Sequence, residues 1–153
     1  MFSKYDVYTT VQSMYCYPDT DVLINKLNIH DKAELKQAEE EFTAVKQMAL
    51  LQEPIKGRFT KTHLFRIHRF LFEDVYPFAG HIRKEQIRKG DTMFYPPDLI
   101  DRELERAFKT IHSKKLLAEQ DKEKQIQNLS QTMAELNIIH PFRELSLIHI
   151  SEP

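Results

Sequence analysis

Two short stretches of the sequence hold the side chains best suited to chemistry. The first is His-Pro-Phe-Arg-Glu, in which His140 and Glu144 lie four positions apart. An imidazole can move protons near neutral pH, and a carboxylate oxygen is a ligand that Mg²⁺ accepts. Each residue also has a plainer interpretation. His140 would donate to the last carbonyls of a helix and gain from its dipole, and Glu144 would be a solvated carboxylate.

The second stretch, residues 75–97, reads Val-Tyr-Pro-Phe-Ala-Gly-His-Ile-Arg-Lys-Glu-Gln-Ile-Arg-Lys-Gly-Asp-Thr-Met-Phe-Tyr-Pro-Pro. The sequence Lys-Gly-Asp at 89–91 indicates a turn between two short runs, 82–88 and 92–95, and so predicts a small β-hairpin. Four cations in this stretch are typical of a solvated hairpin face: Arg83, Lys84, Arg88 and Lys89. The sequence shows neither a companion basic helix nor an aromatic platform, so it does not favour a nucleic-acid interface.

Most of the remaining chain has helical periodicity. Apolar residues recur every three or four positions over about 32–51, 61–76, 98–113 and 119–139, and Asp31 and Thr60 are good N-caps for the first two segments. The last helix should end at His140, because the residue before a proline is pushed out of the α region. The residues that form the apolar faces of these four segments are Leu35, Ala38, Phe42, Val45 and Ala49; Leu64, Ile67, His68 and Leu71; Ile100, Leu104, Ala107, Phe108 and Ile111; and Ile126, Leu129, Met133 and Leu136.

Residues 1–30 precede the first of these helices and are rich in tyrosine. We expect them to form an extended arm followed by a short helix over about 21–27. The aromatic side chains of the arm would pack it onto the body of the domain.

The composition is that of one soluble globular domain. Of 153 residues, 41% are hydrophobic and 29% charged, and the formal net charge of -1 gives no field that favours nucleic acid or an anionic membrane. Cys16 is the only cysteine, so neither an intrachain disulfide nor a cysteine-based zinc site is expected. His63 and His68 are five positions apart, not three or four, so we expect packing or surface roles for them. No apolar run reaches the length of a membrane span and no signal segment is visible, which favours a cytoplasmic protein.

Together and in this order, the two stretches resemble the Fic (Fic/Doc) family. The family motif is His-x-Phe-x-[Asp/Glu]-Gly-Asn-Gly-Arg-x-x-Arg, and His140, Phe142 and Glu144 match its first half. The family's strand-turn-strand flap follows a Tyr-Pro-Trp-Ala-Gly-x-x-Arg sequence, which residues 76–83 resemble closely, and residues 17–29 are similar to the entry segment of many members. The resemblance implies a mainly α-helical domain of the Fic type, with the hairpin as its flap.

The resemblance also implies an activity, protein adenylylation, in which AMP passes from ATP to a Ser, Thr or Tyr hydroxyl of a target protein. It makes His140 the base that accepts the hydroxyl proton, and Glu144 the ligand of Mg²⁺ on the nucleotide phosphates. The flap would bind an extended segment of the target by edge-strand pairing. Its docking residues would be Gln86, Ile87, Arg88, Lys89, Thr92, Met93 and Phe94. Residues with a structural part in the motifs would be Phe142, Tyr76, Pro77, Gly80 and Arg83.

Two other functions stay open at this point. The chain could be a non-catalytic module that binds peptides at the flap edge without nucleotide, or it could transfer a phosphate alone, as Doc-type toxins do. A toxin-like protein of this kind would be regulated by an antitoxin chain or an inhibitory helix. No nucleic-acid or membrane partner is expected.

After Glu144 the sequence departs from the family motif. It continues Leu-Ser-Leu-Ile-His-Ile-Ser-Glu-Pro, without the Gly-Asn-Gly-Arg segment that would hold phosphates at a helix N-terminus, so no nucleotide-binding residues can be assigned. We expect the arm and short helix over 1–30, a partial Fic domain over 31–144 with its C-terminal helices missing, and a tail over 145–153 that is disordered or artefactual. Such a chain should be inactive or nearly so. It should also expose the apolar faces of the helices that end at Ile111 and Ile139.

Overall fold

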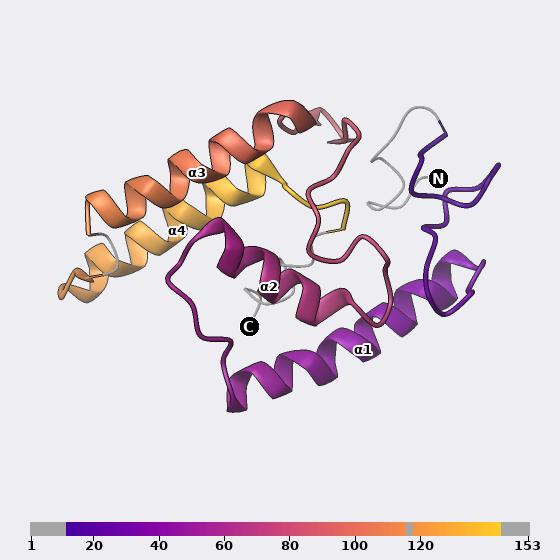
Figure 1. The fold of residues 1–153 in the computed structure, drawn as a ribbon, viewed down its shortest axis with the longest axis horizontal. Coiled ribbons are helices and arrows are strands. Elements are labelled where there is room, and N and C mark those ends of the chain that lie inside the picture. Colours follow the sequence, from indigo (N-terminus) through magenta and orange to yellow (C-terminus); the bar gives the residue numbers. More distant parts are fainter. Residues whose placement is uncertain (1–11, 116–117, 145–153) are drawn as a thin grey trace.

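The computed structural model describes residues 12–115 and 118–144, which form four α-helices and one short β-hairpin. The helices are α1 (Lys32–Gln52), α2 (Lys61–Phe72), α3 (Pro97–Ser113) and α4 (Lys122–Ile139), and the strands are β1 (Arg88–Lys89) and β2 (Thr92–Met93). Figure 1 shows α3 and α4 side by side, with α2 between this pair and α1. The expected mainly α-helical fold with one small hairpin is confirmed. Expectations for residues 1–11 and for the tail over 145–153 lie outside the described residues.

Side-chain caps fix where three of the helices begin. The carboxylate of Asp31 accepts from the backbone N–H of Glu34 (2.9 Å), and the hydroxyl of Thr60 accepts from that of His63 (3.3 Å), as the sequence predicts. Asp121 caps α4, which therefore begins three residues later than expected. Helix α2 ends at Phe72, before the predicted stop at Pro77, in a turn closed by the backbone bond from Tyr76 N to Phe72 O (2.9 Å).

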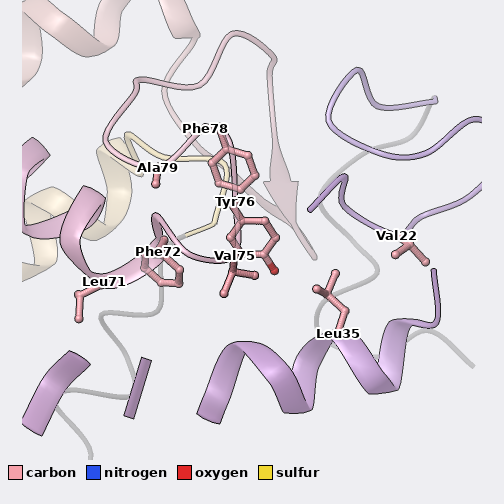
Figure 2. Packing of buried hydrophobic residues seen from close by; sticks show 8 residues of the cluster. All are labelled: Val22, Leu35, Leu71, Phe72, Val75, Tyr76, Phe78 and Ala79. Carbon is pink, nitrogen blue, oxygen red and sulfur yellow. The ribbon is translucent and has the colours of Figure 1, made fainter. Parts of the chain in front are cut away.

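Two apolar clusters form the core. The first joins α1, the end of α2 and the segment that follows α2, as Figure 2 shows; its buried members are Val22, Leu35, Leu71, Phe72, Val75, Tyr76, Phe78 and Ala79. The second lies between α3 and the end of α4; its buried members are Ile100, Leu104, Ala107, Phe108, Ile111, Leu136 and Ile139. All five residues of the predicted α3 face are buried, so the expectation that α3 would expose its apolar face is wrong.

The predicted apolar face of α1 is mostly turned outward. Leu35 is buried, but Val45 is 69% exposed and Phe42 is exposed as well. The helix is rotated by about one residue from the expected orientation, so that Thr43 is buried instead of Phe42. On the inner side of α1, the hydroxyl of Tyr76 donates to the carboxylate of Glu39, and Leu35 and Leu50 pack on the first cluster.

The apolar face of helix α4 is exposed along most of its length. Ile126 is 62% exposed and Leu129 and Met133 are exposed too, whereas only Leu136 and Ile139 are buried. Only the C-terminal turns of α4 enter the cluster shared with α3. The expected exposure of apolar residues on α4 is therefore confirmed.

The segment expected to be a helix over 21–27 is not helical. An isolated antiparallel bridge pairs Cys16 with Leu23, and the backbone N–H of Lys26 donates to the carbonyl of Val75 (2.8 Å). The side chain of Asn25 takes over the local backbone bonds: it donates to the carbonyls of Leu23 and Ile29, and it accepts from two backbone N–H groups of the same segment. Asparagine side chains compete with helical hydrogen bonds in this way.

The hairpin is shorter than the two runs that predicted it. Its strands are antiparallel, with Arg88 opposite Met93 and Lys89 opposite Thr92. At the start of the first run, Arg83 and Lys84 do not pair across the hairpin because their N–H groups bond elsewhere: Arg83 N donates to the carbonyl of Pro141 (2.9 Å), and Lys84 N to the hydroxyl of Tyr15 (2.8 Å).

Candidate active site

His140 lies at the C-terminal cap of α4, where the expected helix end is confirmed. Its backbone is left-handed (φ 49°, ψ 68°), and its N–H donates to the carbonyl of Leu136 (2.8 Å). The imidazole is buried, and the ring of Phe94, which follows β2, stacks on it with centroids 4.2 Å apart. A residue of the flap segment therefore covers the imidazole directly.

Burial of His140, and after it the positive charge of Arg83, lower the pKa of its imidazole from 6.5 to about 4. A hydrogen bond with the Asn137 backbone opposes both effects without overcoming them. Burial and the charge of Arg83 therefore outweigh any gain that the imidazolium would have from the helix dipole. The ring is neutral at pH 7, which is the protonation state that a general base requires.

Arg83 joins the base of the flap to the end of α4. Its side chain is only 1% exposed. The guanidinium donates to four carbonyls: those of His140 (2.7 Å) and Ile139 (3.1 Å) in the motif segment, and those of Glu85 (2.9 Å) and Tyr95 (2.5 Å) beside the hairpin. Desolvation lowers the pKa of Arg83 to about 10, so the group stays charged at neutral pH. These bonds fix the position of the flap relative to His140.

His68, for which packing or a surface role was expected, is a buried link between α2 and the motif. The N–H of Gly80 donates to its Nδ1 (2.9 Å), so Nε2 carries the proton and donates to the carbonyl of Glu144 (2.7 Å). Its ring stacks on Phe142 with centroids 3.7 Å apart. Burial lowers the pKa of His68 to about 4, so it is neutral at pH 7. In the sequence, the feature that points to this role is the position of His68, a polar residue, within the apolar face of α2.

Glu144 is buried, so its interpretation as a solvated carboxylate is wrong. The neighbouring Arg143 is buried too, and its Nε donates to the carboxylate of Glu85 (2.9 Å). Glu85 also accepts from the hydroxyl of Ser13 and from the N–H of Met14 (3.2 Å), which connects residues 13–14 of the arm to the motif segment. No local sequence pattern indicates this ionic link.

The donor set around Glu144 suits one particular kind of metal binding. Among residues 12–115 and 118–144, no group of three or more His, Cys, Asp or Glu side chains gathers as a metal cage. Magnesium is often held by one or two carboxylates with substrate phosphates and water completing the shell. A single hard oxygen donor from Glu144 fits that mode and does not fit an all-protein cage.

The structure divides the seven flap residues into two groups. Gln86, Arg88, Lys89, Thr92 and Met93 are exposed or half-buried. The side chains of Ile87 and Phe94 are instead buried against each other and His140, so their expected contact with a target can involve only the backbone. The amide of Gln86 donates to the carbonyl of Phe94 (2.7 Å), which closes the hairpin base.

The other motif residues form the turn that leads into the flap. Tyr76 is buried and stacks on Phe78 with centroids 4.7 Å apart, whereas Pro77 is exposed. Gly80 has a positive φ of 79° and lies against α2, where an added Cβ would meet the Cβ of Arg69 at 2.9 Å and a backbone oxygen of α2 at 3.0 Å. A glycine is therefore required at this position.

Comparison with known proteins identifies the fold that carries this site. Residues 58–144 match the Fic/DOC family. The chain belongs to the Fic/DOC family. It is 36% identical over 138 residues to a probable protein adenylyltransferase (y4lH) of Sinorhizobium fredii, covering 90% of this chain and 70% of that protein. It is 33% identical over 129 residues to the probable protein adenylyltransferase Fic of Escherichia coli, covering 84% of this chain and 64% of that protein.

A solved Fic domain has the same architecture. The crystal structure of the N-terminal Fic domain of an effector protein from Bartonella sp. AR 15-3 superposes with a TM-score of 0.79 and 27% sequence identity, and the match covers 89% of this chain and 68% of that one. Within the described part of this Fic-family chain, no helix combines the length and apolar character needed to span a bilayer.

Proposed function

We propose that this chain carries the base and the metal-binding carboxylate of a protein adenylyltransferase, which transfers AMP from ATP to a Ser, Thr or Tyr hydroxyl of a target protein. The names of the relatives support the reaction class, since both are described as probable protein adenylyltransferases. The observation that carries the proposal is the placement of His140, neutral and buried under Phe94 of the flap segment.

In the proposed reaction, the target hydroxyl oxygen attacks the α-phosphorus of ATP, and pyrophosphate leaves. A neutral His140 accepts the hydroxyl proton as attack proceeds. Glu144 would hold Mg²⁺, which supplies neutralisation of phosphate charge when bound. Arg83 does not touch the reactants in this account; it holds the backbone of His140 beneath the hairpin.

The flap would set the position of the hydroxyl. A target segment that adds to the open edge of the hairpin would be held through main-chain hydrogen bonds at a fixed register. Exposed Arg88, Thr92 and Met93 support this role, because their side chains remain accessible beside the open edge. A regulatory antitoxin or inhibitory helix is a further prediction that follows from the family, and a cytoplasmic location stays a prediction from the sequence pattern alone.

Residues 145–153 contain neither glycine nor arginine, so we expect a polypeptide of these 153 residues to transfer AMP slowly. Loss of one donor that stabilises transition-state charge lowers kcat by roughly 10²–10³. The experiment measures incorporation of AMP from α-labelled ATP into lysate proteins with Mg²⁺. It compares this chain with a chimera in which residues 145–153 are replaced by the corresponding and following segment of the Escherichia coli relative.

The chimera should transfer AMP, and its His140→Ala variant should not. A chimera that is folded but inactive in both forms would contradict the proposal and favour a module that binds peptides without chemistry. Mass spectrometry of the modified target separates AMP transfer from transfer of a phosphate alone, because the two adducts differ by the mass of adenosine less water.

A further inference from the structure

The exposed side of the flap carries positive charge without local compensation. Lys84, Arg88 and Lys89, here called the flap cations, form no ion pair with any residue in 12–115 or 118–144. The two carboxylates of the same segment do not neutralise them. Glu85 is engaged by Arg143, and Asp91 lies in the turn beyond the strands. The chain as a whole has a net charge of -1, so this surface has a local excess of cations.

The backbone of Arg88 faces the open edge of β1. Phe94 N–H donates to the carbonyl of Ile87 (3.3 Å), so Ile87 and Phe94 form a hydrogen-bonded pair that continues the register of the hairpin. In antiparallel strands such pairs alternate with pairs whose N–H and C=O groups point away from the partner strand. Arg88 is therefore in the outward-pointing class, and the described sheet has no third strand beside it.

The side chain of Arg88 lies on the outer face of the hairpin. Ile87, which precedes Arg88, and Phe94, which pairs with Ile87 across the hairpin, are buried on the inner face. Side chains alternate between the two faces along a strand. Arg88 therefore shares the outer face with its cross-strand partner Met93, which is 58% exposed. A residue of an added strand that pairs with Arg88 would place its side chain on this same face, next to the guanidinium.

We propose that the open edge of β1 selects target segments with an Asp or Glu at the position that pairs with Arg88. The inference rests on the proposed docking of a target strand at the flap and adds the chemistry of the residue that is selected. An extended peptide fits better than a nucleic acid or a lipid surface. Arg88 offers such a peptide both its outward-pointing backbone N–H and C=O groups and its cationic side chain. An anionic polymer or membrane would use the charge and leave these backbone groups without a strand.

The test is a binding titration of the ¹⁵N-labelled 153-residue chain, read from the backbone amides of Arg88 and Met93. Three synthetic threonine-rich peptides of one length differ only at the central position, which is Glu, Gln or Lys. We expect the Glu peptide to bind about two- to fivefold more tightly than the Gln peptide, and the Lys peptide to bind most weakly. Raising the salt concentration should reduce the difference, because the pair is exposed.

A charge reversal gives the deciding comparison. In Arg88→Glu the order of the peptides should invert, so that the Lys peptide binds best. Lys122→Glu is the matched control, because it makes the same change of net charge at an exposed residue at the start of α4 and should keep the original order. An order that stays the same in Arg88→Glu, or no shift of either amide with any peptide, would overturn the inference.

Two further arms separate other ligands and the parent proposal. Shifts of the same amides by phosphatidylserine-containing vesicles or by single-stranded RNA, without shifts by the Glu peptide, would also overturn the inference and assign the patch to that ligand. Because the readout is binding, it is independent of AMP transfer. If the chimera prefers the acidic peptide but fails to transfer AMP, the inference is retained and the proposed enzyme is rejected. If the chimera transfers AMP without a charge preference, the proposed enzyme is retained and the inference is rejected.

Discussion

The Nε atom of Arg83 donates to the carbonyl oxygen of His140 over 2.7 Å, and this bond joins the base of the flap to the residue at the end of α4. The same guanidinium also binds carbonyls of Glu85 and Tyr95 on the hairpin side. One buried cation thus fixes the distance between two segments that are more than fifty residues apart in sequence. The flap and the candidate base are positioned as a unit.

Replacing Arg83 with lysine should destabilise the chain by about 2–4 kcal/mol, because an ammonium cannot reach four carbonyls in the planar geometry of a guanidinium. The measurement is the urea midpoint of unfolding, followed by far-UV circular dichroism. Arg88→Lys is the control, since Arg88 is exposed, and its effect should stay within about 0.5 kcal/mol. Equal effects of the two substitutions would contradict the role given to Arg83.

Gly80→Ala should cost about 2–4 kcal/mol, because the backbone is left-handed and the new Cβ would approach both a side-chain carbon and a backbone oxygen of α2. Gly90→Ala provides the comparison, since Gly90 also has a positive φ (59°) but open space around it. We expect only about 1–2 kcal/mol there from the backbone strain alone. Both values come from urea unfolding at pH 7.5, and a Gly80 effect no larger than the Gly90 effect would show that the close approach to α2 is not rigid.

Stability should decline in mildly acidic solution because two buried histidines are neutral in the folded chain. The pKa values of His68 and His140 are about 4 in the fold and 6.5 ordinarily, so the unfolded chain binds more protons between these values. The stability that the two neutral histidines contribute is fully present above pH 6.5 and is lost as the pH falls toward 4. By about pH 5 each histidine should lower the free energy of unfolding by about 2 kcal/mol.

Urea unfolding at several pH values measures this decline. His68→Gln, which retains a donor for the Glu144 carbonyl, should be less stable at pH 7.5 and should show about half the dependence on pH. A wild-type stability that is constant between pH 7.5 and 5 would mean that neither histidine is held neutral by burial.

The exposed apolar face of α4 should promote self-association. Ile126, Leu129 and Met133 lie on this face, and we expect their combined replacement by serine to lower the sedimentation coefficient at high concentration while leaving the thermal midpoint nearly unchanged. Leu136→Ser is the contrasting variant, because Leu136 is buried and its loss should cost about 2–4 kcal/mol. A wild-type chain that sediments as a monomer at every concentration would contradict the expectation.

Local patterns predicted the element types well and the orientations of two helices poorly. Caps such as Asp31 and Thr60 act within one turn, so the sequence alone defines where α1 and α2 begin. The inner face of α1 is instead determined by a contact between Glu39 and Tyr76, which lie 37 positions apart. Periodicity shows that a helix has an apolar face but not which long-range polar contact will turn it.

The same distinction applies to the site. His140 and Glu144 were found because they belong to one short motif, and Arg83 because it ends another. The bonds that bring these motifs together, from Arg83 to His140 and from His68 to Glu144, join residues 57 and 76 positions apart. No local signal indicates that Glu85 would pair with Arg143, because both read as ordinary surface charges.

If the flap and the end of α4 enclose a neutral imidazole, the protonation of His140 must show it. A long-range ¹H–¹⁵N NMR titration of the wild-type chain, with His140→Gln used to assign the signal, reports its pKa and tautomer. We expect one neutral tautomer at pH 7 and a pKa of about 4. A pKa of 6.5 or higher, or rapid exchange between tautomers at pH 7, would mean that His140 is solvated and that the flap does not cover it.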